Sequence, residues 1–288
     1  MIITRTALSR EQALAEIARL TAMASRIETR CGDGRLVWHL WGSGRPLLLL
    51  HGGSGSWTHW IRNVEAFADR GFQVIVPDLP GSGDSDPPPD GHDADVIPRW
   101  LEAGFADLPI ADSPIDVLAF SFGTLVGVLL ARDWPQRVGR LILTGPPVLR
   151  RNPPPFVGLR SWRDAEPGPA RDAVHRHNLG VFMFADSASI DELAIETHGR
   201  NVERDRLTKR RLAQTSLMHD TIRRLDLPLH LIAGHLDVLY RDKWDEIHAS
   251  LDEVGALRSR RLIENAGHWV AYEAADRYNA TVLALLED

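Results

Sequence analysis

The stretch that most constrains the fold of this chain covers residues 115–131, with the sequence IDVLAFSFGTLVGVLLA. Its first five residues predict a buried strand, and the residues from Phe122 onward predict a helix that is apolar on nearly every face. Ser121 lies between them. A serine on a sharp turn from strand to helix is pushed out of the sheet with its hydroxyl exposed. The helix N-terminus would begin beneath Ser121, where free backbone N–H groups favour developing negative charge.

Residues 119–123 resemble a G-x-S-x-G pattern in which Ala119 replaces the first glycine. Small residues two before and two after the serine allow the helix to lie close to its strand. Two interpretations of Ser121 follow from this pattern alone. It is either a nucleophile or a small residue that packs at a junction between strand and helix, and the rest of the chain has to decide between them.

Further apolar runs predict strands, and amphipathic stretches between them predict helices. The predicted strands are residues 36–41, 47–50, 72–76, 140–144, 229–233 and 258–263. Strands that alternate with helices favour parallel pairing with right-handed crossovers. A helix is also predicted over residues 9–24, where Ser9 and Gln12 fit a capping box. The predicted fold class is α/β, with a mostly parallel central sheet and flanking helices.

The alternation stops between residues 147 and 224. This segment opens with the Pro-rich residues 152–155 and contains three helix-like runs, at about 168–180, 189–202 and 207–218, without a clear strand. We therefore expect residues 1–146 and 225–288 to form one core, and residues 147–224 to form an inserted helical lid over the ends of the strands.

Charge and cysteine content narrow the function classes. The net charge of −6 over 288 residues argues against a general nucleic-acid binder. The single cysteine, Cys31, lies in a predicted turn at residues 30–34 and can form neither an internal disulfide nor a Cys-based zinc site. No apolar run resembles a signal peptide or a membrane span. We expect a cytoplasmic protein with a small-molecule substrate and no nucleic-acid or membrane partner; a homodimer is left open.

An acid and a base follow two of the predicted strands. Asp237 comes just after residues 229–233, and His268 just after residues 258–263, so both should lie at the carboxyl edge of the sheet. A serine hydroxyl is a poor nucleophile until a base takes its proton. His268 is the predicted base, and Asp237 would hold its tautomer and stabilise the imidazolium. Asp242 and Asp245 are weaker candidates for the acid because they fall within the next predicted helix.

A glycine-rich loop follows the strand at residues 47–50 and reads His51-Gly52-Gly53-Ser54. Glycines allow backbone N–H groups to approach a substrate oxygen. The predicted oxyanion hole is the N–H of Gly53 and the N–H of Phe122. The Ser54 side chain either contacts the substrate or caps its own turn. No cofactor or metal is expected, since the proposed chemistry needs none, and His175 and His177 point to different sides of a helix.

The chain order Ser121, Asp237, His268 resembles the α/β-hydrolase superfamily. The segment DLPGSGDS at residues 78–85 is also similar to the D-x-x-G-x-G-x-S segment of that family. The resemblance covers the chain from about residue 36 to the end. It implies the α/β-hydrolase fold and a serine hydrolase with a Ser-His-Asp triad. A serine at position 121 argues against the branches that use an aspartate nucleophile.

Two stretches resemble the meta-cleavage-product hydrolases, which cleave C–C bonds in vinylogous diketo acids. Residues 266–273, AGHWVAYE, are similar to the G-H-W-x-x-x-E of that family, and residues 182–201 resemble part of its lid. The resemblance implies that Arg200 binds a substrate carboxylate and that Trp269 lines the pocket. The alternatives are a solvated helix residue for Arg200 and core packing for Trp269.

The chain departs from that family beside the nucleophile. Phe120 stands where the family tends to have asparagine, and the glycine-rich loop is shorter. Two phenylalanines flanking Ser121 suggest an apolar acyl pocket. The sequence therefore favours a carboxylic-ester hydrolase acting on a small, partly apolar substrate. The alternatives are a C–C bond hydrolase of the meta-cleavage-product type and a non-catalytic ligand receptor on the same fold.

Overall fold

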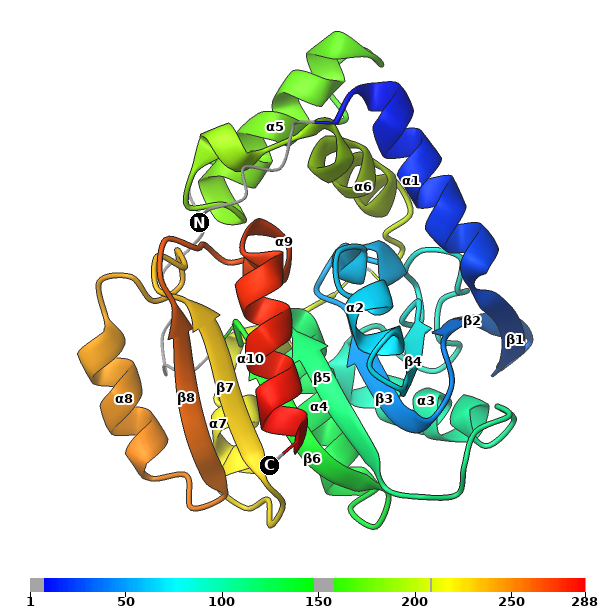
Figure 1. The fold of residues 1–288 in the computed structure, drawn as a ribbon, viewed down its shortest axis with the longest axis vertical. Coiled ribbons are helices and arrows are strands. Elements are labelled where there is room, and N and C mark those ends of the chain that lie inside the picture. The colour runs from blue at the N-terminus through cyan, green and yellow to red at the C-terminus, as the bar shows by residue number, and fades with distance from the viewer. Residues whose placement is uncertain (1–7, 148–157, 208, 288) are drawn as a thin grey trace.

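An eight-stranded sheet runs through the middle of the molecule (Figure 1). The computed structural model describes residues 8–147, 158–207 and 209–287. In space the strands follow the order β1-β2-β4-β3-β5-β6-β7-β8. Strands β3 to β8 pair in parallel, whereas β2 pairs antiparallel with both β1 and β4. The bounds are β1 Ser25–Cys31, β2 Gly34–Trp41, β3 Arg45–Leu50, β4 Phe72–Pro77, β5 Ile115–Phe120, β6 Val138–Thr144, β7 Leu229–Gly234 and β8 Leu257–Ile263.

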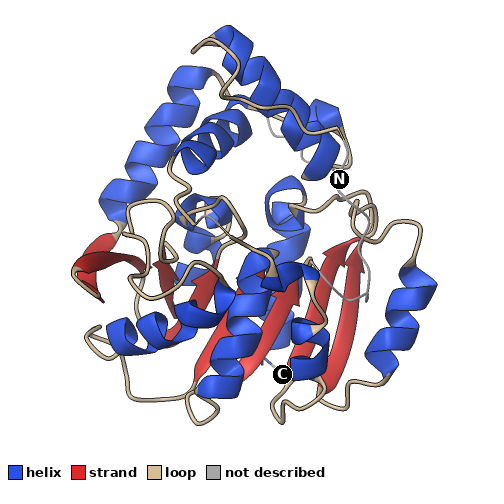
Figure 2. Cartoon of the chain, turned by 180° about the vertical axis from the view of Figure 1, so that it is seen from behind, coloured by secondary structure: helices blue, strands red, loops and turns tan. Residues whose placement is uncertain are grey.

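The central strands are apolar on both faces because helices cover both sides of the sheet (Figure 2). Side chains of a strand point alternately to its two faces. In β3, Leu48 and Leu50 join one hydrophobic core, and Leu47 and Leu49 join the other. The helices are α1 Arg10–Met23, α2 Val64–Ala68, α3 Ile97–Phe105, α4 Phe122–Asp133, α5 Pro169–Phe182, α6 Glu192–Glu203, α7 Leu217–Ile222, α8 Trp244–Asp252, α9 Val270–Glu273 and α10 Ala275–Glu287.

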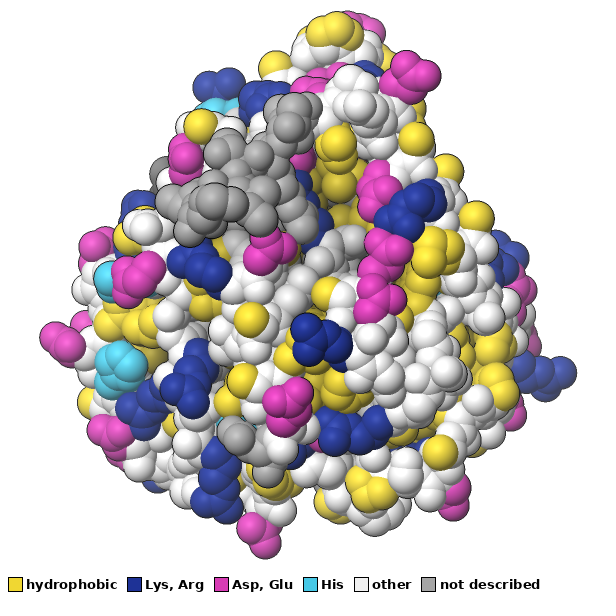
Figure 3. All heavy atoms as spheres, in the orientation of Figure 1, with side chains coloured by type: hydrophobic (Ala, Val, Ile, Leu, Met, Phe, Trp, Pro, Cys, Tyr) yellow, Lys and Arg dark blue, Asp and Glu magenta, His cyan; other side chains and the backbone are white. Residues whose placement is uncertain are grey.

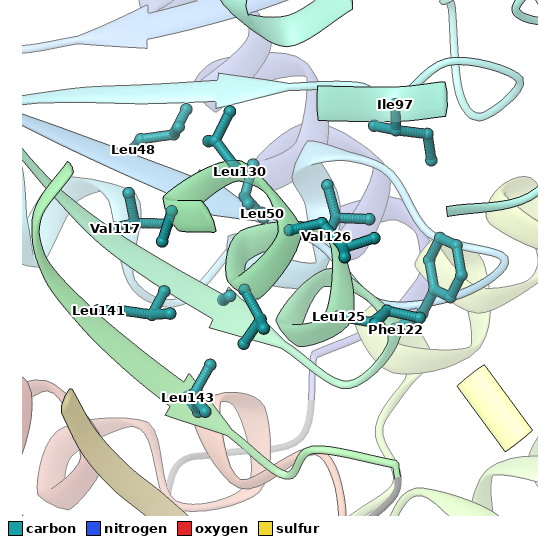
Figure 4. Packing of buried hydrophobic residues seen from close by; sticks show 14 of the residues in the cluster. Leu48, Leu50, Ile97, Val117, Phe122, Leu125, Val126, Leu130, Leu141 and Leu143 are labelled. Atoms are coloured by element: carbon teal, nitrogen blue, oxygen red, sulfur yellow. The ribbon is translucent and has the colours of Figure 1, made fainter. Parts of the chain in front are cut away.

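Helix α4, which follows Ser121, is the most deeply buried of these helices. All ten residues from Phe122 to Ala131 are buried. Figure 4 shows Leu125, Val126 and Leu130 of this helix among side chains of the neighbouring strands, such as Leu50 and Val117. This packing explains why the sequence is apolar all round the helix. The mostly parallel sheet with flanking helices confirms the predicted fold class.

Helices α5 and α6 lie beyond the carboxyl ends of the strands (Figure 1). They belong to the predicted lid, residues 147–224, whose Pro-rich start at residues 152–155 lies outside the described residues. Helix α1 packs against α6, and Arg10 forms ion pairs with Asp172 of α5 and Glu196 of α6. The capping box of α1 is present as predicted. The division of the chain into core and lid stays a prediction.

Two local predictions are wrong. Residues 25–31 form the edge strand β1, so Cys31 is a buried strand residue, and the turn begins after it. The alternation of polar and apolar residues over residues 25–31 is too weak to predict a strand. The helix predicted over residues 207–218 is also absent: a 3-10 turn at Leu212–Gln214 precedes the short α7, and Leu207 is instead buried in a loop.

The surface is mixed in charge. Basic and acidic side chains are interspersed over the face shown in Figure 3. Within residues 8–147, 158–207 and 209–287, no helix is both long enough and apolar enough to cross a membrane.

Candidate active site

Ser121 occupies a strained turn between β5 and α4. Its backbone has φ 49° and ψ −121°, a conformation that costs a non-glycine residue about 1–3 kcal/mol. The turn is held by hydrogen bonds from the Ser121 N–H to the Thr144 carbonyl (2.8 Å) and from the Thr124 hydroxyl to the Ser121 carbonyl (2.5 Å). The fold therefore presents the Ser121 hydroxyl at the carboxyl edge of the sheet.

Small residues let α4 pack closely on the sheet. A Cβ atom at Gly123 would lie 2.5 Å from the His51 carbonyl oxygen and 2.6 Å from that of Leu50. The alanine that replaces the usual first glycine faces a second glycine, because a Cβ atom at Gly127 would lie 3.3 Å from the Ala119 Cβ. The larger residue at position 119 is thus accommodated by the absence of a side chain at position 127.

Ser121, His268 and Asp237 form a continuous hydrogen-bonded chain. His268 Nε2 lies 2.9 Å from Ser121 Oγ, and His268 Nδ1 lies 2.8 Å from Asp237 Oδ2. Asp237 is fully buried, and its other carboxylate oxygen accepts the Leu239 N–H at 2.9 Å. A carboxylate can only accept, so the proton between the two side chains sits on Nδ1. Nε2 is then free to accept the Ser121 proton, as a general base must.

The two predicted oxyanion donors flank Ser121. Phe122 is the first residue of α4, so its N–H has no acceptor within the helix. The N–H of Gly53 makes no hydrogen bond to any part of the chain that the structure describes. A Cβ atom at Gly53 would lie 3.6 Å from the Phe122 Cβ, so the two residues are neighbours. Two free N–H groups side by side are what a tetrahedral oxyanion requires.

The three predicted substrate-binding residues, Ser54, Arg200 and Trp269, lie in three different surroundings. Ser54 Oγ donates to Asp205 Oδ2 at 2.6 Å, so it ties the glycine loop to the segment after α6. The Arg200 side chain is 49% exposed and lies 3.7 Å from the buried Glu196 of the same helix. Trp269 has no exposed surface, and its indole N–H donates to the His59 carbonyl. Arg200 is thus paired with an acidic neighbour, and Trp269 offers no exposed surface to a substrate.

Three residues that the sequence reasoning missed lie at the site. The Phe182 ring is 4.8 Å from the His268 ring, centroid to centroid, so the end of α5 contacts the base. Arg210 lies over the Phe122 ring, 5.3 Å from its centroid, and pairs with Asp205 at 2.6 Å. His59 accepts the Gly52 N–H at 3.1 Å. Phe182 begins the stretch that resembles the family's lid, whereas no motif marks His59 or Arg210, which only the folded chain brings to the site.

The loop at residues 78–85 is ordered by its own carboxylates. Asp78 accepts the N–H groups of Trp57 and Asp84, and Asp84 pairs with Arg204. One potential ligand atom from each of His39, Asp78 and Asp84 lies within 4.8 Å of the others. The hydrogen bonds and the ion pair of the two aspartates account for them as residues that order this loop.

Proteins of known family resemble this chain over most of its length. A model of the alpha/beta hydrolase fold family matches residues 45–173. A 2-hydroxy-6-oxononadienedioate/2-hydroxy-6-oxononatrienedioate hydrolase from Burkholderia vietnamiensis (strain G4 / LMG 22486) is 30% identical over 262 residues, which cover 83% of this chain and 86% of that protein. The chain belongs to the α/β-hydrolase family. It is a hydrolase with sequence similarity to meta-cleavage-product hydrolases.

Other relatives support the same family. A 2-hydroxy-6-oxo-6-phenylhexa-2,4-dienoate hydrolase from Burkholderia cepacia is 27% identical over 267 residues, covering 85% of this chain and 88% of that protein. Among solved structures, carboxylesterase CesB from Bacillus subtilis has a TM-score of 0.76 at 17% identity, covering 96% of this α/β-hydrolase and 98% of CesB. The meta-cleavage product hydrolase CumD from Pseudomonas fluorescens IP01 has a TM-score of 0.73 at 20% identity, covering 91% and 97%. At these identities the structural likeness shows the fold alone.

Proposed function

We propose that this α/β-hydrolase cleaves a carbon–carbon bond next to a ketone in a small unsaturated keto acid, with Ser121 as the nucleophile. The hydrogen-bonded chain from Ser121 through His268 to Asp237 carries the proposal. The relatives that share 25–30% of their residues over more than four fifths of the chain are named as hydrolases of 2-hydroxy-6-oxo dienoates and dienedioates. This support favours C–C cleavage over the carboxylic-ester hydrolysis that the sequence motifs first suggested.

In the proposed reaction, His268 Nε2 takes the Ser121 proton as Ser121 Oγ bonds to the ketone carbon. The carbonyl electron pair moves to oxygen, where the N–H groups of Gly53 and Phe122 would stabilise it, each by about 3 kcal/mol. When the carbonyl re-forms, the C–C bond breaks and its electron pair leaves with the conjugated acid fragment. The imidazolium of His268 then donates its proton to that fragment. Water, deprotonated by His268, hydrolyses the acyl ester on Ser121.

Arg210 supports an acidic substrate. Its guanidinium lies beside the glycine loop, where Nε would be 3.2 Å from a Cβ atom at Gly53. This Nε is buried and has no hydrogen-bond partner in the described part of the chain. A free, charge-assisted donor next to the oxyanion hole suits a carboxylate of the substrate. In the proposal Arg210 therefore takes the role that the family resemblance suggested for Arg200.

Carboxylic-ester hydrolysis is the second candidate, favoured by the phenylalanines around the serine. Phe120 packs on His268 with ring centroids 5.1 Å apart, and Phe182 contacts the same imidazole. Phe120 is buried behind the base, and the partly exposed Phe182 ring suits a neutral acyl group. The same attack on a carbonyl carbon serves an ester, with an alcohol as the leaving group. The connected triad counts against the third alternative, a non-catalytic receptor.

Parallel turnover of two substrate types tests the proposal. The purified enzyme is given a meta-cleavage diketo acid and a series of short p-nitrophenyl esters, and kcat/KM is measured for each. We expect the diketo acid to be preferred by about 100-fold or more, equivalent to about 2.7 kcal/mol of transition-state binding. Efficient turnover of esters alone would establish the second candidate instead, and turnover of neither would support the receptor.

A further inference from the structure

Two buried histidines hold the Gly52 residue from opposite sides. The Gly52 N–H donates to His59 Nδ1 at 3.1 Å, and the Gly52 carbonyl oxygen lies 2.8 Å from His51 Nδ1. His51 Nε2 in turn accepts the Leu79 N–H at 2.9 Å. His51 is 1% exposed and His59 is 2% exposed. Both polar groups of the Gly52 backbone are therefore bound to imidazole nitrogens rather than to water.

These contacts determine which ring nitrogen carries the proton. His51 Nε2 accepts an N–H, so the proton of the neutral ring is on Nδ1, which donates to the Gly52 carbonyl. His59 Nδ1 also accepts an N–H, so its proton is on Nε2. Burial lowers the pKa of His51 and lowers that of His59 well below the usual histidine range. Both rings are thus neutral, with the lone pairs that the two backbone N–H groups need.

The Gly52 carbonyl and the Gly53 N–H belong to one peptide unit. A trans peptide is planar, so these two groups point in opposite directions. When His51 binds the Gly52 carbonyl, the Gly53 N–H must point away from His51. Rotation of this peptide would replace the Gly53 donor with a carbonyl oxygen, which would repel an oxyanion. His59 binds the N–H of the preceding peptide unit and so fixes the orientation of Gly52, from which this peptide extends.

The His59 ring is itself held firmly. It packs against His51, Phe120 and Trp269, with ring centroids 6.1, 5.5 and 5.2 Å away. The His59 backbone carbonyl accepts the Trp269 indole N–H at 2.9 Å. Trp269 directly follows the base His268, so one rigid cluster connects the base to the glycine loop. This contact also gives the buried Trp269 a role that does not require it to touch the substrate.

We propose that His59 is a positioning residue of the oxyanion hole, and that its Nδ1 lone pair holds Gly52 so that the Gly53 N–H faces the developing oxyanion. The inference rests on the proposed attack of Ser121 on a carbonyl group. It predicts that the hydrogen-bond acceptor at position 59 controls the rate of the chemical step and leaves substrate binding almost unchanged.

Two substitutions separate the acceptor from the packing. His59→Asn keeps an acceptor near the position of Nδ1, whereas His59→Leu fills space without one. We expect His59→Leu to lower kcat by about 100-fold, the order of losing one oxyanion donor, with KM changed by less than about 3-fold. His59→Asn should restore at least about 10-fold of that loss. His175→Leu, which removes a buried histidine of the inserted segment, is the matched control and should keep kcat.

A tetrahedral adduct gives a readout that packing alone would not move. A trifluoromethyl ketone binds as such an adduct, and its Ki should rise across the His59 variants in proportion to the fall in kcat/KM. Unchanged Ki and kcat in folded His59→Leu would overturn the role of His59 and leave the proposed function intact. Full activity of Ser121→Ala would instead overturn the proposed function itself.

The intact enzyme provides a test that does not depend on folding of a variant. In ¹⁵N NMR of histidine-labelled protein, His59 should show the chemical shifts of a neutral ring with its proton on Nε2 and an unprotonated Nδ1. A proton on Nδ1 would contradict the inference, because that nitrogen could not accept the Gly52 N–H.

Discussion

Arg210 lies beside the glycine loop, whereas Arg200 was the arginine that the sequence suggested for the substrate carboxylate. Family resemblance suggested Arg200, but its side chain is half exposed and pairs with Glu196. Arg210, which no motif marks, places a buried and unpartnered Nε–H beside Gly53. Sequence spacing gives the helix that carries Arg200 but does not give the direction in which a long, flexible side chain leaves it.

A pair of arginine variants tests which of the two binds the substrate carboxylate. We expect Arg210→Ala to raise KM for an acidic substrate by about 10- to 100-fold, because a charge-assisted hydrogen bond is lost. The KM for a neutral p-nitrophenyl ester should change by less than about 3-fold. Arg200→Ala is the control and should leave both values near those of the wild type. Equal losses for acidic and neutral substrates in Arg210→Ala would mean that Arg210 does not bind a carboxylate.

The Cys31 thiol is unreactive because it is buried. Cys31 was expected in a turn, but it is a buried residue of β1. Burial raises the pKa of its thiol to about 11, so the reactive thiolate is scarce at neutral pH. The physical cause of this low reactivity is desolvation by the fold.

At the scale of elements, the close approach of α4 to the sheet sets the position of Ser121. Gly123 lies against the backbone carbonyls of Leu50 and His51, whereas Gly127 lies against the side chains of Ala119 and Leu141. Backbone atoms cannot move aside as side chains can. The two glycines of one helix should therefore differ in their tolerance of a methyl group.

Urea unfolding of glycine variants measures that difference. We expect Gly123→Ala to cost about 3 kcal/mol of unfolding free energy, since α4 must shift away from β3, and Gly127→Ala to cost about 1–2 kcal/mol. In the double variant Ala119→Gly with Gly127→Ala, part of the Gly127→Ala cost should be recovered. If the two costs add without any recovery, Ala119 and Gly127 do not compensate each other.

The elements that the sequence predicted are those whose periodicity reflects burial. Strands β3 and β5 are apolar on both faces, and the helix after Ser121 is apolar all round, so their patterns match their surroundings. Strand β1 lies at the edge of the sheet and is partly exposed, which leaves a mixed pattern. Residues 204–207 are held by contacts with distant loops, such as Asp205 with Ser54, which local periodicity cannot reveal.

For the molecule as a whole, buried histidines make stability depend on pH. Burial lowers the pKa of His39, His51, His59 and His175, and it lowers that of His198 to about 3. Below about pH 6.5 the unfolded chain binds protons at these residues, while the folded protein resists them. The histidine contribution to stability is therefore complete above that pH and is lost as the pH falls toward the lowered pKa values.

Unfolding by urea at several pH values tests whether the free energy of unfolding falls with pH in this direction. We expect the free energy of unfolding to fall as the pH is lowered from about 7.5 to 5.5. His198→Asn should make this fall smaller, whereas His92→Asn, at an exposed position, should leave it as in the wild type. A free energy of unfolding that rises over the same range would show that the buried histidines do not dominate the pH dependence.

The topology of the whole sheet explains why the three triad residues were predictable from the sequence. Ser121, Asp237 and His268 each follow a strand, and the parallel order of the sheet brings strand ends together. Their positions therefore follow from topology, which the sequence pattern reveals. His59, Phe182 and Arg210 reach the site through loops and the inserted segment, whose paths depend on tertiary contacts.

Covalent labelling tests directly whether Ser121 is the nucleophile and whether His268 activates it. A fluorophosphonate probe should modify one residue of the native enzyme, identified by peptide mass spectrometry as Ser121. Labelling should be absent in Ser121→Ala and slowed by about 1,000-fold or more in His268→Ala, since the hydroxyl then lacks its base. Labelling of Ser121→Ala at the wild-type rate, or of another residue in the native enzyme, would contradict the account.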